Sequence, residues 1–459
     1  VSVFVSLAGP ALPRGATVHI DGRVLLFTFA LSALVGVVCG ASPVIRMRLA
    51  ALTAALREGD TRTGTGRGRV FGNGLVVVEI ALAFALLAGA GLLVKNLMLL
   101  EHRDAGIKPD HVIAFDVLPA GARYTDNAAV SGLYRTLYDR LAHMGRVTHA
   151  GLTSHLPMYK YGNNGEMTRA GGNPWTANDN PLVEYREYYG DYFAALGIPL
   201  LRGRLLDGRD GPNTLTVLIN QTMADKFWPR ENPIGTRFGQ GSDVSKYWIV
   251  AGVIGNVRSY GLARKAPYEF YRTTDQAPYA PMTIVLRSSV DDPAALMPSA
   301  RAIVASVDPS LPIRKVQTMD DVVSESVAEP RLLSALSSTF GGLAGLLAMV
   351  GIYGVTAYNV RRQRREYGIR LALGADPSAV RRLILGRNAA VAALGIGIGL
   401  AGALLLSRVL QSMLNDVQAT DPSVLAWNAA AVLIVCLLAS YIPARWAGRV
   451  DPAVVLRLE

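Results

Sequence analysis

The dominant feature of this sequence is a set of five apolar runs, each about 20 residues or longer. An α-helix rises 1.5 Å per residue, so about 20 apolar residues cross the roughly 30 Å hydrocarbon core of a bilayer. The runs occupy residues 24–45, 74–100, 332–360, 388–410 and 424–443. We therefore expect a membrane protein with an α-helical transmembrane bundle of five spans.

Two charged residues lie inside the second run, Glu79 near one end and Lys95 near the other. Side chains near the ends of a span can extend to the polar interfaces. We interpret Glu79 as interfacial. The alternative is a functional role inside the membrane, because intramembrane carboxylates are costly and are retained mainly at functional sites.

The charged residues are distributed unevenly along the chain. They make up 18% of the sequence, less than the roughly 25% typical of soluble domains. The segment 101–331 contains 25 Lys/Arg and 25 Asp/Glu, whereas the rest of the chain contains 21 basic and 10 acidic residues. This pattern excludes a single soluble enzyme domain, a disordered chain and a nucleic-acid-binding protein that uses its whole surface. It predicts one large soluble domain attached to a membrane bundle.

The side of the membrane on which each loop lies follows from the arginines, because cytoplasmic loops carry an excess of basic residues. Residues 46–73 contain six Arg against two acidic residues, residues 361–387 contain eight against two, and the tail 444–459 contains three Arg. The loop 411–423 contains two Asp and no basic residue. We therefore place the first three segments in the cytoplasm, and the stub 1–23, the domain 101–331 and the loop 411–423 outside.

Glycines within the predicted spans recur at a spacing of four residues. Gly341 and Gly345 form one such pair, and Gly395 and Gly399 form another. Small residues at this spacing allow helix backbones to approach closely in lipid, so we predict helix packing there. The alternative is that glycine is simply common in membrane helices. None of the spans carries a charge relay or polar stripe, which argues against an ion-coupled carrier.

Segment 21–59 resembles segment 421–459 at an offset of 400 residues. Both begin with Asp, contain an apolar run that ends at a proline, and continue into a short basic stretch containing Leu-Arg. A repeat of this kind indicates duplication. We interpret 24–45 as the last span of a truncated first half and 46–73 as a basic linker. With no signal peptide at the start, we expect the chain to be part of one about twice as long.

The segment 101–331 reads as an α+β domain of two lobes. Its apolar, β-branched runs predict strands at 111–117, 214–219, 248–254 and 283–286. Helices are predicted at 131–144, 220–228 and 293–307, and an exposed loop at 162–180. Neither a nucleophile elbow, a metal-binding HExxH nor a recognisable acid pair is present in the sequence, so no catalytic, cofactor or metal site is predicted.

The segment 361–387 is the most informative part of the sequence. An arginine-rich helix follows the third span, ends at Gly374, and a new helix begins with Asp376 as its cap and Pro377 in its first turn. We call this segment the elbow. Its mixture of charged and apolar residues suits docking into a groove of another protein. The alternative is an ordinary solvated positive-inside loop.

The run Arg-Glu-Tyr-Gly-Ile-Arg-Leu-Ala-Leu-Gly-Ala at 365–375 resembles the signature that follows the second span of MacB/FtsX-type ABC transporter permeases. Further segments are similar to the same family. Residues 75–93 resemble its first span, 192–204, 217–220, 228–235 and 253–258 its periplasmic core domain, and 451–457 its C-terminal tail. With the repeat, the layout resembles the C-terminal half of the duplicated, two-half permeases described from Acidobacteria. The extra span 24–45 departs from a single four-span unit.

This resemblance implies a non-enzymatic permease subunit in the bacterial inner membrane, with a periplasmic core domain. ATP would be bound and hydrolysed by a separate cytoplasmic ABC ATPase, and the sequence contains no G-x-x-x-x-G-K-[ST] loop. A second permease half, which is either the missing N-terminal half or another copy, and a periplasmic or outer-membrane protein are the other implied partners; nucleic acid is not. The resemblance implies that the ATPase-coupling elbow is formed by Arg361, Arg362, Arg364, Arg365, Glu366, Gly368, Arg370, Ala372, Gly374 and Asp376.

Such a permease would transmit ATP-driven conformational change to its periplasmic domain for export or efflux. Two alternatives stay open at this point. An FtsX-like protein would regulate a periplasmic cell-wall hydrolase, and an orphan permease without an ATPase would act as a scaffold or sensor.

Overall fold

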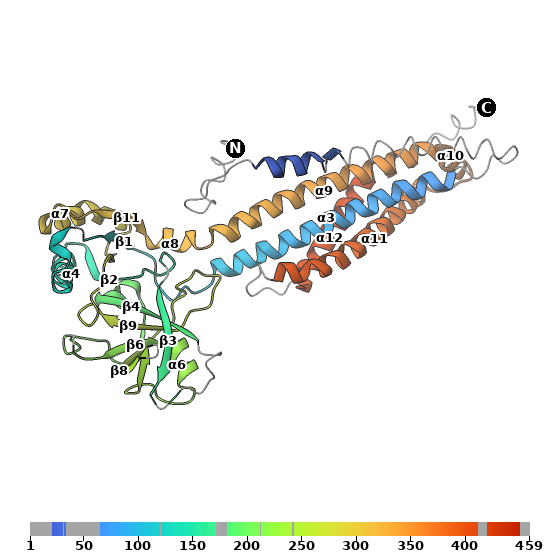
Figure 1. Ribbon diagram of the computed structural model, residues 1–459. Coiled ribbons are helices and arrows are strands. Elements are labelled where there is room, and N and C mark those ends of the chain that lie inside the picture. The colour runs from blue at the N-terminus through green and yellow to red at the C-terminus, as the bar shows by residue number, and fades with distance from the viewer. Residues whose placement is uncertain are drawn as a thin grey trace. The chain divides into compact units, whose positions relative to one another are not determined.

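The computed structural model describes residues 21–30, 32–33, 65–119, 121–160, 162–170, 172, 181–211, 213–240, 243–411 and 420–449. The chain divides into two compact units (Figure 1). The outer unit is Leu100–Val327, and the membrane unit combines Val1–Leu99 with Ala328–Glu459.

The described part of the membrane unit includes four long helices. They are α3 (Thr65–Glu101), α9 (Ala328–Arg362), α11 (Pro377–Gln411) and α12 (Pro422–Ala447). The described residues include four helices that are long and apolar enough to cross a membrane, each with a window of mean hydropathy between 1.7 and 2.4. The predicted span 24–45 lies largely outside the described residues, so a count of five stays a prediction.

Helix α3 is the central helix of this unit. Half of its most apolar window is buried against the other helices, compared with 17% to 22% for α9, α11 and α12. Its side chains form one apolar cluster with α9, α11 and α12, whose buried members include Ile80, Phe84, Ile352, Ala392 and Cys436. The four helices lie side by side in Figure 1. Many of their large apolar side chains are exposed on the bundle, as expected for lipid contact.

The four glycines of the helix-packing prediction all face α3. A Cβ atom on Gly399 would lie 2.6 Å from the carbonyl oxygen of Ala81, and one on Gly395 would lie 2.8 Å from Ile80. The α9 glycines are less tight, since a Cβ atom on Gly341 or Gly345 would lie 3.2 or 3.7 Å from Leu87. The backbone of α11 therefore approaches α3 more closely than any side chain at 399 would permit.

The outer unit contains one 11-stranded sheet that serves two lobes. The strands are β1 (Val112–Val117), β2 (Val147–Thr153), β3 (Asn163–Arg169), β4 (Leu182–Gly190), β5 (Leu200–Gly203), β6 (Thr216–Asn220), β7 (Arg237–Gln240), β8 (Asp243–Ile254), β9 (Glu269–Thr273), β10 (Met282–Ser288) and β11 (Ile313–Thr318). The helices are α4 (Asn127–Ala142), α5 (Tyr192–Leu196), α6 (Gln221–Phe227), α7 (Met297–Val307) and α8 (Met319–Glu325).

The first lobe is an antiparallel sheet in the order β11-β1-β10-β2-β4. Alternate residues of β1, β2 and β10 face α4 and α7, and together they form a core that includes Phe115, Tyr134, Leu152, Leu286 and Val304. This is the period-2 pattern expected of strands that bury one face under helices.

In the second lobe the strands close on themselves. The pairings run β4-β3-β7-β8-β6-β9 and return from β9 to β4. The enclosed core includes Phe227, Trp228, Phe238 and Phe270, with α6 packed on it. Closure leaves few unpaired backbone groups at strand edges. Strand β4 belongs to both lobes and therefore connects their two cores.

The predicted strands and helices fall within one to a few residues of observed elements, with one exception. The loop predicted at 162–180 is wrong at its start, because residues 163–169 form β3 and pair with both β4 and β7. Asn and Gly disfavour strands locally, but ladders on both sides and the buried Met167 outweigh that preference. Residues 173–180 lie outside the described residues.

A fully buried ion pair lies on the shared strand. The Arg186 guanidinium donates from Nε to Glu269 Oε1 at 2.9 Å and from Nη1 to the carbonyl oxygen of His155 at 2.9 Å. Glu269 also accepts hydrogen bonds from Ser259 Oγ at 2.6 Å and Tyr271 OH at 2.8 Å. Both charged side chains are inaccessible to solvent. Buried charges require such partners because the interior does not solvate them.

Replacing Gly399 by Ala should destabilise the membrane unit by about 1–3 kcal/mol, because the added methyl collides with the backbone of α3. Gly397→Ala is the matched control, since no atom lies within 4 Å of the added Cβ there. The thermal unfolding midpoints of the two variants in detergent measure the difference. Equal midpoints would mean that the close approach of α11 to α3 carries no stability.

Removing one partner of the buried ion pair should destabilise the outer unit by about 3–5 kcal/mol, because a charge is left buried without compensation. We expect Arg186→Met to reduce amide-exchange protection of β4 and β9 in the full chain. Arg209→Met, which removes an exposed arginine paired with Asp207, is the control and should leave protection unchanged. Unchanged protection in Arg186→Met would contradict the prediction.

Candidate coupling site at the arginine-rich elbow

The elbow consists of a short helix between two spans. Helix α9 ends at Arg362, helix α10 (Arg364–Ala372) follows, and α11 begins at Pro377. Gly374 has a φ of +91°, a conformation that glycine adopts without strain. The N–H of Gly374 donates to the carbonyl of Leu371, and that of Ala375 donates to Arg370, both at 3.0 Å. This pair of bonds is a Schellman motif, which ends the helix.

Asp376 starts the next helix. Its Oδ1 accepts a hydrogen bond from the N–H of Ser378 at 3.1 Å, and its Oδ2 accepts one from the Ser378 hydroxyl. These two bonds, together with nearby Arg381 and Arg382, hold the pKa of Asp376 below its usual range. The chain therefore reverses between α10 and α11 in four residues with each helix end capped.

Helix α10 contributes a buried side chain to a cluster at the ends of three spans. Tyr367 is buried with Val360 of α9, Val380 and Ile384 of α11, and Ala444 and Ala447 of α12. We call these six residues the elbow cluster. Tyr367 also donates from its hydroxyl to Gln363 Oε1 at 3.0 Å. Gly368 is buried beside Tyr367. The elbow cluster thus links α10 with the ends of α9, α11 and α12.

The other face of the elbow is exposed and basic. Arg361, Arg362, Arg364 and Arg365 are exposed, and Glu366 pairs with Arg370 at 2.7 Å, one helical turn away. Two apolar side chains accompany them, Ile369 with 42% and Leu373 with 83% of its surface exposed. Ala372 is exposed as well. Of the predicted coupling residues, only Gly368 is buried; the other nine lie on the exposed side of the elbow.

A polar contact also joins two spans, α3 and α12, at the end of the bundle away from the elbow. Lys95 of α3 donates from Nζ to Asp421 Oδ2 at 2.5 Å and to Ser423 Oγ at 3.2 Å. Asp421 also caps α12 by accepting from the N–H of Ser423 at 3.0 Å. The Lys95 ammonium and the Ser423 hydroxyl hold the pKa of Asp421 well below its usual range. Sequence reasoning placed Lys95 at an interface and missed its partner, which is 326 residues away.

Glu79 lies against α9 inside the membrane unit. A Cβ atom on Gly351 would lie 2.1 Å from the Glu79 Oε2 atom, so this glycine provides space for the carboxylate. A partly buried polar pair lies elsewhere in the bundle, where Asn388 Nδ2 of α11 donates to Thr356 Oγ1 of α9 at 2.9 Å. Glu79 therefore contacts a neighbouring helix and is only partly exposed.

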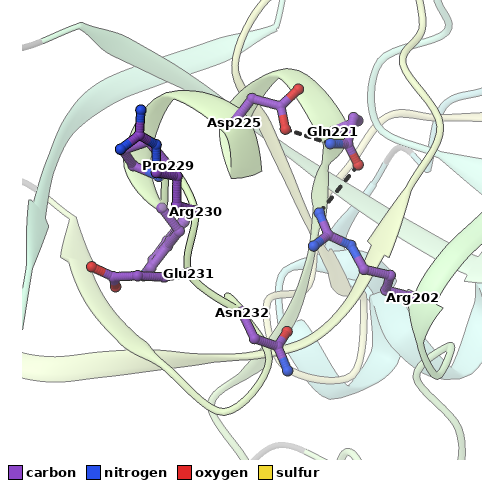
Figure 2. Close-up of a pocket in the computed structure, with 8 residues that line it drawn as sticks. Arg202, Gln221, Asp225, Pro229, Arg230, Glu231 and Asn232 are labelled. Atoms are coloured by element: carbon purple, nitrogen blue, oxygen red, sulfur yellow. Dashed lines mark hydrogen bonds between the residues drawn. The ribbon is translucent and has the colours of Figure 1, made fainter.

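The outer unit has a polar pocket of about 730 Å³ beside α6. Figure 2 shows Arg202 pointing to Gln221, which in turn points to Asp225; Arg202 donates to Gln221 Oε1 at 3.3 Å. The rest of the lining is Trp228, Pro229, Arg230, Glu231 and Asn232. Among the described residues no group of His, Cys, Asp and Glu is arranged to hold a metal ion. The pocket therefore has the character of a polar binding surface. Sequence reasoning did not find it.

Helices of membrane-spanning length, together with a mixed α and β outer unit, fit a membrane permease with an extracytoplasmic domain. Residues 338–452 match the family described as FtsX-like permease C-terminal. This range contains the elbow and the whole of α11 and α12. The chain resembles MacB/FtsX-type ABC transporter permeases, and the FtsX-like region includes every residue of the elbow cluster.

Curated relatives include two export proteins. The chain is 34% identical over 141 residues to the pyoverdine export ATP-binding/permease protein PvdT of Pseudomonas savastanoi pv. phaseolicola. The aligned region covers 29% of this chain and 20% of that protein. The chain is also 22% identical over 280 residues to the macrolide export ATP-binding/permease protein MacB 2 of Aeromonas hydrophila subsp. hydrophila. This aligned region covers 59% of this chain and 42% of that protein. The chain thus spans less than half the length of these relatives.

Among solved structures, the periplasmic region of MacB from Actinobacillus actinomycetemcomitans aligns with 49% of this chain and 95% of its own length. The sequence identity is 14% and the TM-score is 0.33.

The Lys95–Asp421 pair should stabilise the contact between α3 and α12. Lys95→Met and Asp421→Asn each remove the ion pair, and Asn keeps the capping oxygen. We expect each single variant to lower the thermal unfolding midpoint in detergent. The midpoint of the double variant should be no lower than that of the less stable single variant. Additive losses in this double-mutant cycle would show that the two residues do not interact.

Proposed function

We propose that this chain is the permease subunit of a MacB/FtsX-type ABC transporter that transmits ATP-driven motion from a cytoplasmic ATPase to a periplasmic outer unit, for export or efflux. The observation that carries this proposal is the elbow cluster, in which a buried tyrosine of one short helix joins residues from the ends of three spans. The arginine-rich ends of these spans lie in the cytoplasm by the positive-inside rule. ATP would be held by the partner and not by this chain.

The exposed face of the elbow suits a protein partner. It combines arginines with the two exposed apolar side chains Ile369 and Leu373. Protein interfaces typically have an apolar or aromatic centre surrounded by charged residues, with arginine enriched. The Glu366–Arg370 pair leaves the face strongly positive, so an acidic groove on the ATPase is the complementary surface.

One unbroken helix connects the outer unit with the elbow. Helix α9 begins at Ala328, directly after the outer unit ends, and runs for 35 residues to Arg362, directly before α10. Helix α3 ends at Glu101, where the outer unit begins. A continuous helix transmits displacement along its axis better than a jointed one, because each turn is held by backbone hydrogen bonds. This supports mechanical transmission through α9.

The proposed partners extend beyond the ATPase. A second permease half, either an N-terminal half of a longer chain or another copy, would complete the pair of elbows that an ATPase dimer requires. The outer unit would engage a periplasmic or outer-membrane protein. Its polar pocket beside α6 offers a surface for such contact. A regulator of a cell-wall hydrolase would use the same elbow and differ in its outer partner.

Reversing charge on the elbow should weaken binding of the ATPase. We expect Arg364→Glu with Arg365→Glu to reduce the ABC ATPase recovered with the tagged full chain from native membranes by about tenfold or more, because like charges would face each other across the interface. Arg445→Glu with Arg449→Glu changes the same charge at the end of α12 and is the control. The readout is quantitative mass spectrometry of the recovered ABC ATPases.

Equal recovery from both double variants would contradict coupling through the elbow. Recovery of no ABC ATPase even with the unaltered chain would instead support an orphan scaffold.

A further inference from the structure

A groove runs between α11 and α12 at the elbow end of the membrane unit. Its volume is about 490 Å³. It is lined by Ser378, Arg381, Arg382, Leu385, Gly386, Ala389, Leu437 and Tyr441. The α11 residues recur at intervals of three or four, so they share one face of that helix, and Leu437 and Tyr441 are one turn apart on α12. The groove therefore lies along the two helices.

The groove is polar at one end and apolar along the rest. Ser378, Arg381 and Arg382 lie in the first two turns of α11, next to the elbow. Leu385, Ala389 and Leu437 lie deeper in the spans. Gly386 presents no side chain, and a Cβ atom there would meet nothing within 4 Å. A molecule that fits this groove has an acidic or polar head and an apolar tail.

Both arginines line the groove, and their charges also act on Asp376. Within the part of the chain that the structure describes, no ion pair joins Arg381 or Arg382 to a carboxylate. The nearest acidic residue in sequence is Asp376, whose two oxygens accept hydrogen bonds from Ser378. Guanidinium groups bind phosphate through paired N–H donors, and two adjacent arginines provide more than one such pair.

We propose that the groove binds one anionic phospholipid of the leaflet on the elbow side. The lipid phosphate would contact Arg381 and Arg382, and an acyl chain would lie on Leu385, Ala389 and Leu437. Basic pockets between transmembrane helices on the cytoplasmic side commonly bind anionic headgroups. A free phosphate would leave the apolar half of the groove unoccupied, which is why a lipid is the better match. This inference rests on α11 and α12 crossing a membrane and does not require an ATPase.

A lipid in this position would tie the start of α11 to the end of α12. The same two helix ends contribute Val380, Ile384, Ala444 and Ala447 to the elbow cluster. A Cβ atom on Gly448 would lie 3.1 Å from the carbonyl oxygen of Pro377, so the two ends already touch. The bound lipid therefore stabilises the base on which α10 packs, and lipid composition would influence the stability of the elbow.

The test measures lipid binding to the purified full chain by native mass spectrometry in neutral detergent. The probes are phosphatidylglycerol, phosphatidylethanolamine and glycerol phosphate. We expect selective retention of one phosphatidylglycerol. Arg381→Gln with Arg382→Gln should weaken the affinity for phosphatidylglycerol roughly thirtyfold, because the two arginines contribute about equally to the binding free energy of the anionic headgroup. Arg381→Lys with Arg382→Lys should restore part of the affinity by keeping the charge. Arg445→Gln with Arg449→Gln is the matched control outside the groove.

A steric variant separates a lipid from a free anion. Ala389→Trp should fill the apolar part of the groove and reduce phosphatidylglycerol binding while both arginines remain. Size-exclusion chromatography confirms that each variant is folded and monodisperse before it is scored. The proposal is overturned if the glutamine variant keeps the lipid, if the control loses as much, or if glycerol phosphate binds as well as the lipid. A change in oligomeric mass in Ala389→Trp without a change in lipid count would assign the groove to a second copy instead.

Discussion

The membrane unit depends on the close approach of α11 to α3. Inside a bilayer the hydrophobic effect does not drive helices together, because lipid tails are as apolar as the side chains. The remaining attractions include interhelical hydrogen bonds and van der Waals contact, and the latter falls steeply with distance. Gly395 and Gly399 bring the backbone of α11 onto α3, so that α3 becomes the helix around which the others pack. The elbow cluster draws its residues from the ends of α9, α11 and α12, which pack with α3 in this bundle.

The outer unit depends on a comparable shared element. Strand β4 pairs with β2 in the first lobe and with β3 and β9 in the second. The side chain of Arg186 projects from β4 into a fully buried network with Glu269 and the carbonyl of His155. Such a network has one low-energy geometry, because any displacement leaves a charge without its partner. The two lobes are therefore expected to move as one body.

The sequence predicts features whose cause is local. Hydropathy alone located the four described spans, and Gly374 with Asp376-Pro377 marked the break between α10 and α11, since glycine and capping residues act on their immediate neighbours. Features that join distant residues were missed. The closed ring of the second lobe, the Lys95–Asp421 contact and the strand at 163–169 depend on partners tens to hundreds of residues away, and no local pattern encodes them.

The candidate site likewise has one part that the local sequence predicts and one part that depends on distant residues. The exposed arginines of the elbow were visible as a charge pattern, whereas the burial of Tyr367 against three helices follows only from the folded bundle. That burial distinguishes the elbow from a solvated loop, because a loop anchored at its two ends alone would absorb a push from a partner by bending. Because α10 ends in a Schellman turn and its Tyr367 is buried in a cluster with residues of α9, α11 and α12, a displacement of α10 would disturb the packing at the ends of these spans.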